Sequence, residues 1–465
     1  MPRGTGFPAR GLVARVWKLR GALPGAAPIS RVTQVERLPS IRPMKLPPRA
    51  LLALFAVSLA AAGLLARPPS APTPADAVAL GFDAARLKRL ETVIQDHVDR
   101  KQLAGGVMYV ARDGKLAHFR AYGQQDIEAG RAMAPDAIFR IASMSKAVSS
   151  VAVMMLYEEG RFRLQDPVER FLPAFRGGVV AVPPPAGAPA GTRYGTEPVR
   201  RPIRIRDLLT HTAGLTYGSG LAAAEYKAAG LSGWYFADKD ETLAAVIDRL
   251  GRLPLHAHPG EAYQYGYSTD VLGRLVEVVS GLPLDRFFAE RIFAPLGMTD
   301  THFFLPPEKQ ARLAKVYALD GGVLRPGDQG HYVQGPRKCF SGGAGLVSTA
   351  RDYARFLQLL LNGGELEGVR LLSRKSVELM RTDHLGEKYR GDTAGFGLGF
   401  WVNTQPGRHG ELGSEGAYGW GSAYFPQYVV DPRERLVALF LTQLMPAGGS
   451  DLNQRWKIAM YQALR

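Results

Sequence analysis

Ser143 and Lys146 belong to the only Ser-x-x-Lys sequence in the chain, within residues 140–148 (RIASMSKAV). The apolar residues that follow recur at helical spacing, which predicts that the tetrad opens a buried helix. Residues three apart lie on one face of a helix, so the Lys146 amine should lie beside the Ser143 hydroxyl. A neighbouring base can activate a serine for nucleophilic attack without any histidine. The N–H groups at the helix start also suit a developing oxyanion.

Two further segments have residues that would complete such a site. Residues 259–273, PGEAYQYGYSTDVLG, carry Tyr265 and Tyr267 in a loop that runs into a helix. Residues 416–424, GAYGWGSAY, form a glycine-rich approach to a strand whose N–H groups could face the serine. Together these segments offer a nucleophile, a proton shuttle and an oxyanion hole, the parts that acyl transfer requires.

The elements that must position these residues are strands at both ends of the chain and helices between them. The periodicity predicts a first helix over 84–98 and a β-hairpin turning at Asp113-Gly114. Further short strands are expected over 396–402, 421–430 and 436–441. This order predicts an α/β domain completed by both ends of the chain, with an all-α region inserted.

We assign residues 1–77 to an N-terminal extension with a Pro/Ala linker, and residues 78–465 to a single hydrolase domain. Within that domain, the α/β part is expected at about 78–140 and 330–465, and the helical part at about 141–329. The division follows the change from strand-like to helical patterns along the chain.

The extension contains an uncharged apolar run, Leu51–Leu65, preceded by Lys45 and Arg49. Its length suits the core of a signal peptide better than a membrane-spanning helix. We therefore expect a periplasmic or secreted protein, with an uncleaved inner-membrane anchor through residues 51–65 as the alternative. Since Met44 stands where a signal peptide would begin, it is a second candidate for the natural start.

Composition excludes several other classes of protein. The net charge is +16, but residues 1–75 carry +10 of it, which leaves +6 on the remaining chain and gives no sign of a nucleic-acid partner. The single cysteine, Cys339, rules out an internal disulfide and a cysteine-based zinc site, and we expect it to be a packed residue. His256 and His258 lack further ligands, so no metal or other cofactor is predicted.

With these segments in view, the chain resembles the serine β-lactamase and penicillin-binding-protein superfamily. It is most similar to the class C β-lactamase-like branch that includes the family VIII carboxylesterases. The resemblance extends from Gly81 to Gln443 and rests on several phrases in one order. They are LLTHTAGL (208–215), DVLGRLVEVVSG (270–281), ERIFAPLGMTDTHF (290–303), GAGLVSTARDYARFLQLLLNGG (343–364), GFGLGF (395–400) and VVDPRERLVALFLTQ (429–443).

The resemblance implies a β-lactamase/transpeptidase-like fold, in which an antiparallel sheet is flanked by helices. It also implies that Ser143 is the acylated nucleophile, with Lys146 and Tyr265 as its catalytic partners. Ser143 and Ala423 would supply the two oxyanion N–H groups. Which of the lysine and the tyrosine is the general base stays open, since such a pair can titrate as a unit.

Two departures from the β-lactamase pattern bear on the substrate. Tyr267 stands where the Tyr-x-Asn motif has its asparagine, and Trp420 replaces the lysine of Lys-Thr-Gly. The second replacement removes a cation that could pair with a substrate carboxylate. We therefore expect Tyr267, Trp420, Gly421 and Ser422 to bind a neutral ester, although Tyr267 could equally be a packing aromatic. Ser422 departs from the Trp-Gly-Gly of the esterases and would narrow the entrance.

The predicted activity is that of a serine carboxylesterase, in the general class EC 3.1.1, acting on a small-molecule ester. A β-lactamase or D-alanyl-D-alanine carboxypeptidase is the first alternative, and a non-catalytic envelope binding protein is the second. The absence of a Gly-x-Ser-x-Gly sequence argues against an α/β-hydrolase. His211, in LLTHTAGL, is expected to be structural. The sequence does not indicate the oligomeric state.

Overall fold

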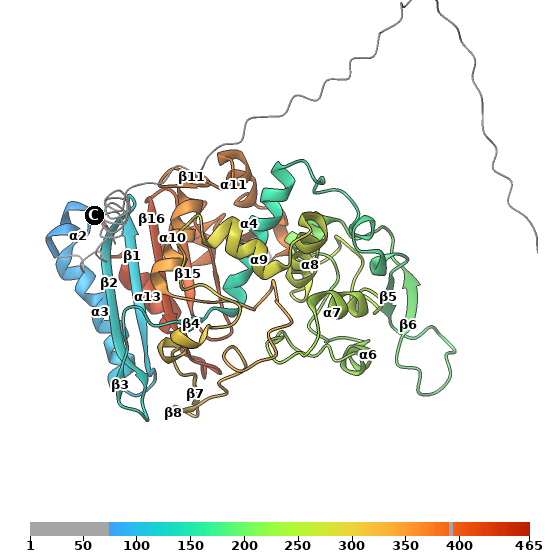
Figure 1. Cartoon of the computed structure of the whole chain (residues 1–465), viewed down its shortest axis with the longest axis horizontal. Coiled ribbons are helices and arrows are strands. Elements are labelled where there is room, and N and C mark those ends of the chain that lie inside the picture. The colour runs from blue at the N-terminus through green and yellow to red at the C-terminus, as the bar shows by residue number, and fades with distance from the viewer. Residues whose placement is uncertain (1–73, 390–393) are drawn as a thin grey trace, which may run out of the picture. The chain divides into compact units, whose positions relative to one another are not determined.

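An eight-stranded antiparallel sheet forms the centre of the folded unit Ser70–Arg465 (Figure 1). The computed structural model describes residues 74–389 and 394–465. The strands lie in the order β12-β13-β14-β15-β16-β1-β2-β3. Their bounds are β1 Gly105–Arg112, β2 Lys115–Asp126, β3 Arg131–Ala132, β12 Gly395–Phe396, β13 Trp401–Val402, β14 Tyr418–Gly421, β15 Gln427–Asp431 and β16 Leu436–Thr442.

Four two-stranded ladders lie outside this sheet. They are β4 Phe139–Arg140 with β9 Val347–Ser348, β5 Val179–Val182 with β6 Gly195–Pro198, β7 Tyr317–Asp320 with β8 Val323–Pro326, and β10 Glu365–Leu366 with β11 Val369–Arg370. Because β4 directly precedes the Ser-x-x-Lys segment, its pairing with β9 fixes where that segment starts.

The α-helices are concentrated between the two groups of strands. Their bounds are α2 Pro74–Ala79, α3 Ala84–Asp99, α4 Ser145–Glu158, α5 Ile205–Leu209, α6 Ala223–Ala228, α7 Leu243–Leu250, α8 Ser268–Ser280, α9 Leu284–Phe288, α10 Ala350–Leu361, α11 Arg374–Met380, α12 Pro406–His409 and α13 Leu452–Tyr461. A 3-10 turn, η1 (Ala142–Met144), leads directly into α4. This arrangement confirms the predicted fold class, an antiparallel sheet flanked by helices with a helical insertion.

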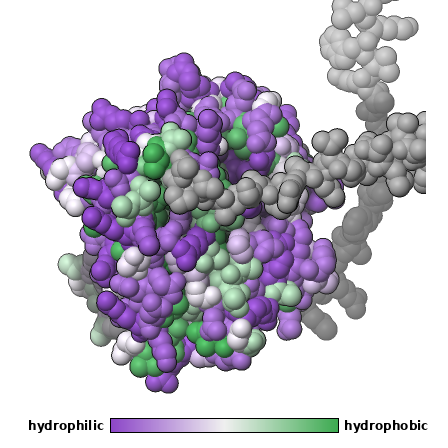
Figure 2. Space-filling view, turned by 90° about the vertical axis from the view of Figure 1, so that its left-hand side faces the viewer, coloured by the Kyte–Doolittle hydropathy of each residue, from purple (hydrophilic) through white to green (hydrophobic). Residues whose placement is uncertain are grey.

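Both faces of the sheet are covered, and alternate residues of β16 show how. Val437, Leu439 and Leu441 pack into a core shared with α4, α8 and α10. Leu436 and Phe440 pack into the opposite core, shared with α3 and α13. The helices α3 and α13 therefore lie on one face of the sheet, and α10 and α4 on the other. Figure 2 shows that the face carrying α2 and α3 is mostly hydrophilic toward solvent.

Two predicted strands are interrupted, and each prediction was wrong for an identifiable local reason. The predicted strand 421–430 is split by a turn in which Phe425 takes the positive φ of +75°. The predicted strand 396–402 turns back on itself at Gly399, whose φ is +111°. A left-handed residue reverses the chain, so one apolar run becomes two paired strands.

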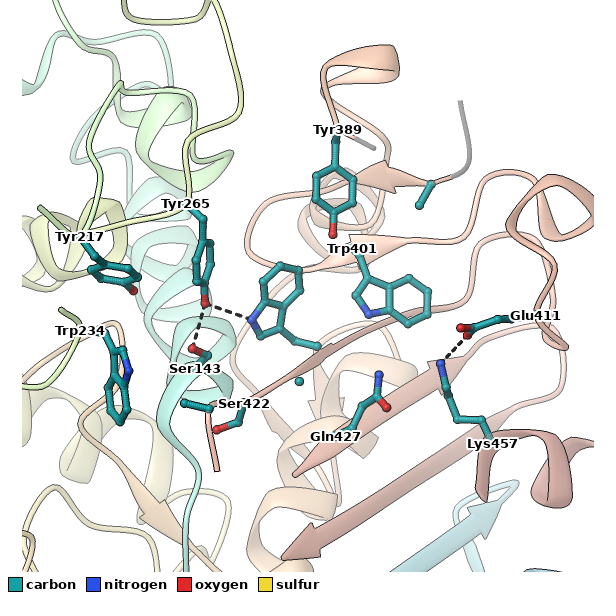
Figure 3. Close-up of a pocket in the computed structure, with 14 residues that line it drawn as sticks. Ser143, Tyr217, Trp234, Tyr265, Tyr389, Trp401, Glu411, Ser422, Gln427 and Lys457 are labelled. Atoms are coloured by element: carbon teal, nitrogen blue, oxygen red, sulfur yellow. Dashed lines mark hydrogen bonds and ion pairs between the residues drawn. The ribbon is translucent and has the colours of Figure 1, made fainter. Parts of the chain in front are cut away.

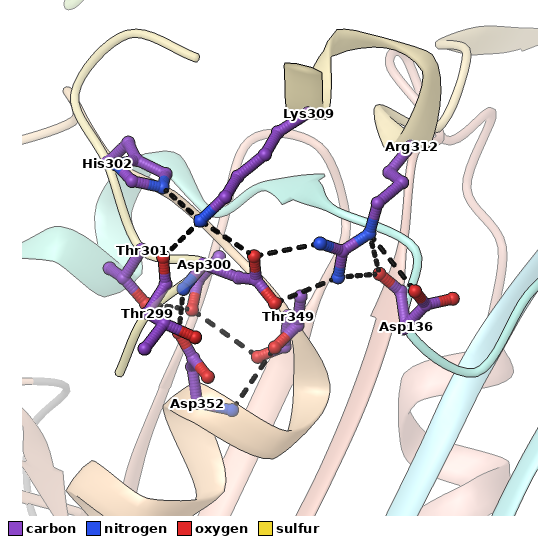
Figure 4. A network of polar contacts seen from close by, with 10 residues as sticks. Asp136, Thr299, Asp300, Thr301, His302, Lys309, Arg312, Thr349 and Asp352 are labelled. Atoms are coloured by element: carbon purple, nitrogen blue, oxygen red, sulfur yellow. Dashed lines mark hydrogen bonds and ion pairs between the residues drawn. The ribbon is translucent and has the colours of Figure 1, made fainter. Parts of the chain in front are cut away.

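A polar network supports β9, the partner of β4, from behind (Figure 4). Asp300 receives two hydrogen bonds from Arg312, at 2.8 and 2.9 Å. The Asp300 N–H in turn donates to the Asp352 carboxylate at 2.7 Å, and the Thr301 hydroxyl donates to the same oxygen at 3.0 Å. The Thr301 hydroxyl also lies 2.8 Å from the Ser348 hydroxyl of β9. The network therefore joins α10 to the strand pair that leads to Ser143.

The apolar run 51–65 and the candidate start Met44 lie outside the described residues, so the export signal and anchor stay predictions. Within residues 74–389 and 394–465, no helix combines the length and apolarity that crossing a membrane requires.

Candidate active site

Ser143 is held in a strained turn. It occupies η1, one residue after Ala142, whose φ of +32° lies in the left-handed region that only glycine adopts freely. Such a conformation costs about 1–3 kcal/mol and persists where the surrounding contacts enforce it. One of these contacts is the hydrogen bond from the Tyr353 phenol to the Met144 carbonyl, at 2.8 Å. The turn presents the serine at the start of α4.

The three predicted catalytic side chains meet at the serine oxygen. The Tyr265 phenol donates to Ser143 Oγ at 2.9 Å, and Lys146 Nζ donates to the same oxygen at 3.3 Å. Lys146 also lies 4.8 Å from the centre of the Tyr265 ring, so the ammonium faces the aromatic π-system. The helix α4 is apolar on almost every side and buried, which leaves the Lys146 side chain only 1% exposed. Figure 3 shows the phenol directed at the serine.

The lysine is anchored from its far side by the segment 341–343. Lys146 Nζ donates to the Gly343 carbonyl at 2.7 Å. The Gly343 N–H donates to the carboxylate of Asp270 at 3.1 Å, and the Ser341 hydroxyl donates to the same carboxylate oxygen at 2.5 Å. Burial raises the pKa of Asp270, while Ser341 and the nearby Lys146 lower it. Asp270 on α8 thus fixes the carbonyl that receives the ammonium.

A cavity of about 490 Å³ opens beside Ser143. Six aromatic side chains line it, which makes its walls largely apolar: Tyr217, Trp234, Tyr265, Tyr389, Trp401 and Trp420. Gly421, Ser422 and Ala423 line it as well, next to the serine. The structure thus brings Ser143, Tyr265, Trp420 and residues 421–423 to one cavity. Whether Ser143 and Ala423 form the oxyanion hole stays a prediction.

Trp420 contacts the catalytic tyrosine directly. Its indole N–H lies 3.4 Å from the Tyr265 phenol oxygen, and the two ring centres are 5.7 Å apart. Ser422 faces the cavity with an Oγ that is buried and has no hydrogen-bond partner among the described residues.

Tyr267 is placed differently from the substrate-binding position that the motif suggested. It is 0% exposed, and its phenol donates to the Gly233 carbonyl at 2.6 Å. Its ring stacks on Phe236, with 5.6 Å between centres. Two residues along a loop need not share a direction, and here Tyr265 points to the serine while Tyr267 points into the core. Tyr267 is therefore a packing aromatic, the alternative left open above.

Tyr217 lies in the site although the sequence reading did not select it. Its ring centre is 5.7 Å from that of Tyr265 and 5.9 Å from Lys146 Nζ. Its hydroxyl is buried without a hydrogen-bond partner among the described residues, and burial raises its pKa well above the ordinary value. The available signal was its position just after the phrase LLTHTAGL.

The remaining candidates lie outside the chemistry. His211 is buried against the Tyr265 ring, at 4.9 Å between centres, and burial together with Lys146 lowers its pKa. His258 pairs with Glu197 at 2.6 Å. No cluster of three or more metal-ligating side chains occurs among the described residues. Cys339 is buried, and burial raises the pKa of its thiol.

Comparison with known proteins shows the family to which the chain belongs. The family model described as Beta-lactamase matches residues 90–462. Protein Rv1367c of Mycobacterium tuberculosis (strain ATCC 25618 / H37Rv) is 39% identical over 370 residues, covering 76% of this chain and 89% of that protein. Esterase EstB of Burkholderia gladioli is 33% identical over 399 residues, covering 81% of this chain and 95% of that protein.

A solved structure gives the same result for the fold. EstCE1, described as a hydrolase with promiscuous acyltransferase activity, superposes with a TM-score of 0.69 at 28% identity, covering 81% of this chain and 99% of that one. The long family match and the esterase relatives confirm the resemblance inferred from the motifs. The chain therefore belongs to the beta-lactamase family and is a serine hydrolase of the β-lactamase fold.

Proposed function

We propose that the protein is a carboxylesterase that forms an acyl-enzyme on Ser143. The observation that carries the proposal is the pair of hydrogen bonds at Ser143 Oγ, from the Tyr265 phenol at 2.9 Å and from Lys146 Nζ at 3.3 Å. Two titratable groups in contact with one hydroxyl can accept its proton and return it.

In the proposed reaction, Ser143 Oγ attacks the ester carbonyl carbon while its proton passes to the Lys146–Tyr265 pair. The carbonyl oxygen becomes an oxyanion that the N–H groups of Ser143 and Ala423 would stabilise. Collapse of this intermediate breaks the bond to the alcohol, which leaves with the proton held by the pair. A water molecule then attacks the acyl-enzyme, gives its proton to the pair and releases the acid, returning the proton to Ser143.

The lining of the cavity favours esters over β-lactams. Trp420 contacts Tyr265 at the position where the β-lactamase motif has a lysine. Among the described residues that line the cavity, Lys457 is the only cation, and Glu411 pairs with it. A substrate carboxylate would therefore find no unpaired cation there, whereas a neutral ester needs none.

The test compares p-nitrophenyl acetate with a chromogenic cephalosporin, using the wild type and Ser143→Ala. We expect ester turnover that the substitution abolishes, and an acetyl adduct on the wild type in intact-mass spectrometry. Cephalosporin turnover far above ester turnover would make the protein a β-lactamase. Turnover of neither, with no adduct, would favour a binding protein.

Ser145→Ala is the matched control within the same tetrad. The Ser145 side chain accepts the Leu346 N–H at 3.1 Å and does not line the cavity. This variant should lose some stability but still acquire the acetyl adduct. Loss of the adduct in Ser145→Ala with retention in Ser143→Ala would refute the assignment of the nucleophile.

A further inference from the structure

The cavity beside Ser143 has a second part that the ester chemistry does not use. Figure 3 shows its lining residues in two groups, with Ser143, Tyr217 and Tyr265 on one side of the view. The other group consists of Trp401, Glu411, Gln427 and Lys457, and we call the space that it lines the distal chamber.

Strand register shows that the distal chamber belongs to the opposite face of the sheet. Gln427 pairs with Gly421, and Trp401 pairs with Gly419. Directly paired residues share a face, and so do residues two apart on one strand. Gln427 and Trp401 therefore lie on one face, where Trp401 packs on the core that includes α13. At the sheet edge Trp401 also packs on the cluster that contains Tyr389 and Phe396, as Trp420 does. Trp420 lies one residue before Gly421 on β14, so its side chain is on the other face of the sheet, where it contacts Tyr265.

Gly421 provides the passage between the two faces. The last residue pairs of β13 with β14 are at Tyr418 and Gly419, so Gly421 has no neighbour on that side of the sheet. A β-carbon built at Gly421 would meet nothing closer than the Pro426 carbonyl oxygen, at 3.7 Å. The absence of a side chain at this position leaves room for a substrate chain to cross the sheet edge.

Two polar atoms, one in the distal chamber and one at the passage, have no hydrogen-bond partner among the described residues. Gln427 Oε1 is buried and makes no hydrogen bond with any described residue. Ser422 Oγ, at the passage, is also buried and makes no hydrogen bond with any described residue. An unpaired buried polar atom is unfavourable, and a ligand that supplies the missing bond recovers that free energy.

The chamber also selects against a charged ligand. Lys457, only 9% exposed, forms an ion pair with Glu411, so the two charges cancel within the lining. A neutral group that both donates and accepts suits this surrounding better than an ion, because it can donate to Gln427 and accept from Ser422 or Lys457. A hydroxyl has both capacities.

We propose that the distal chamber binds a hydroxyl group at the far end of the longer half of the ester, whose apolar chain or ring system passes Gly421. The proposal rests on the proposed ester hydrolysis at Ser143. It specifies the substrate class as an elongated, uncharged ester with an apolar middle and a hydroxylated end.

The first experiment needs only the wild type. Two series of esters are compared at each chain length from two to twelve carbons: p-nitrophenyl alkanoates with and without a terminal hydroxyl, and acetates of alkanols with and without one. At one chain length in one of the two series, we expect the terminal hydroxyl to raise kcat/KM about fivefold to tenfold. This is the gain that one buried hydrogen bond provides. No gain at any length in either series would overturn the proposal.

The second experiment uses Gln427→Leu, which keeps the size of the side chain and removes the acceptor. The hydroxyl gain should disappear, while p-nitrophenyl acetate, too short to reach the chamber, should be hydrolysed at the wild-type rate. Gln358→Leu, on α10 outside the cavity, is the matched control and should keep the gain. If Gln427→Leu does not hydrolyse acetate, Gln427→Met replaces it.

The outcomes separate the two proposals. A wild type inactive on p-nitrophenyl acetate would refute the proposed function itself. Acetate turnover with a hydroxyl gain that survives in both Gln427 variants would refute only the distal chamber as its origin.

Discussion

Replacing Asp270 with asparagine should slow ester turnover even though Asp270 touches neither the serine nor the cavity. The carboxylate holds Gly343 in place, and the Gly343 carbonyl receives the Lys146 ammonium at 2.7 Å. Asp270 therefore supports Lys146 indirectly, because the two side chains bind the N–H and the carbonyl of the same residue, Gly343. Asp270→Asn and Asp270→Ala weaken this support to different degrees, so the two variants should form a graded series.

The geometry gives the size of each step. Both hydrogen bonds to Asp270, from Ser341 at 2.5 Å and from Gly343 at 3.1 Å, end on the same oxygen, which an asparagine amide can still supply. Hydrogen bonds to a charged group contribute about 1.5–3 kcal/mol and neutral ones about 0.5–1.5 kcal/mol, so Asp270→Asn should lose about 2 kcal/mol over both. If half of this free energy, about 1 kcal/mol, appears as a higher barrier because Gly343 and therefore Lys146 are held less well, kcat/KM falls about fivefold.

Asp270→Ala removes the acceptor from two buried donors. Each unpaired donor costs about 1–3 kcal/mol, and a displacement of a catalytic contact by about 1 Å can slow a reaction on the order of 10²-fold. The assay is kcat/KM for p-nitrophenyl butyrate, together with urea unfolding of the same preparations. We expect turnover to decrease from wild type to Asp270→Asn to Asp270→Ala.

Asp431→Asn is the matched control. Asp431 is also fully buried and accepts several hydrogen bonds, including one from the Tyr461 phenol at 2.9 Å, but it does not line the cavity. It should lose stability and keep its turnover per folded molecule. If the Asp270 variants behave in the same way, with kcat/KM unchanged, Asp270 supports only the fold and does not position Lys146.

Three other substitutions should have effects of known direction. Tyr217→Phe removes a buried hydroxyl without a described partner, so urea unfolding should show equal or up to about 1 kcal/mol greater stability; a clear loss would mean that the hydroxyl has a partner. Burial raises the pKa of Asp352 from 3.8 to about 6. Its contribution to stability is therefore present below about pH 4 and lost as pH rises through about 6, by up to about 3 kcal/mol. Asp352→Asn should remove this loss, and parallel urea-unfolding curves for variant and wild type between pH 4 and 8 would contradict the assignment. At Gly399, φ is +111° and a β-carbon would lie 2.2 Å from Ser150 Oγ, so Gly399→Ala should lower the unfolding free energy by about 3 kcal/mol or more; a urea-unfolding free energy within about 1 kcal/mol of wild type would be the contrary result.

The catalytic side chains could be predicted because their arrangement is mostly local. Ser143 and Lys146 are three residues apart, and a single helical turn brings them together. Tyr265 could be identified from the sequence motif that contains it, within residues 259–273. Tyr267 illustrates the limit of such placement, because the direction of a loop side chain depends on what packs beside it. Its ring stacks on Phe236, and no property of the sequence near residue 267 specifies that contact.

The fold class could be predicted from the order of strand-like and helical segments, but turns inside apolar runs could not. Phe425 has a positive φ without being glycine or asparagine, so composition gives no sign of the reversal. The distal chamber could not be predicted from the sequence for a related reason. It depends on the pairing of Gly421 with Gln427, which exists only once the register of the sheet is set.

The position of β16 in the sheet has a consequence for biosynthesis. This strand, the last of the eight in chain order, lies between β15 and β1, the first strand of the sheet in chain order. About 330 residues separate the end of β1 from the end of β16. At about 5–20 residues per second, β1 can pair with β2 almost at once but waits on the order of half a minute for β16, its second neighbour. A nascent chain that has not reached Leu436 lacks the strand that joins β15 to β1, so the central ladder is open. Hydrolytic competence therefore requires translation at least through Thr442, the end of β16.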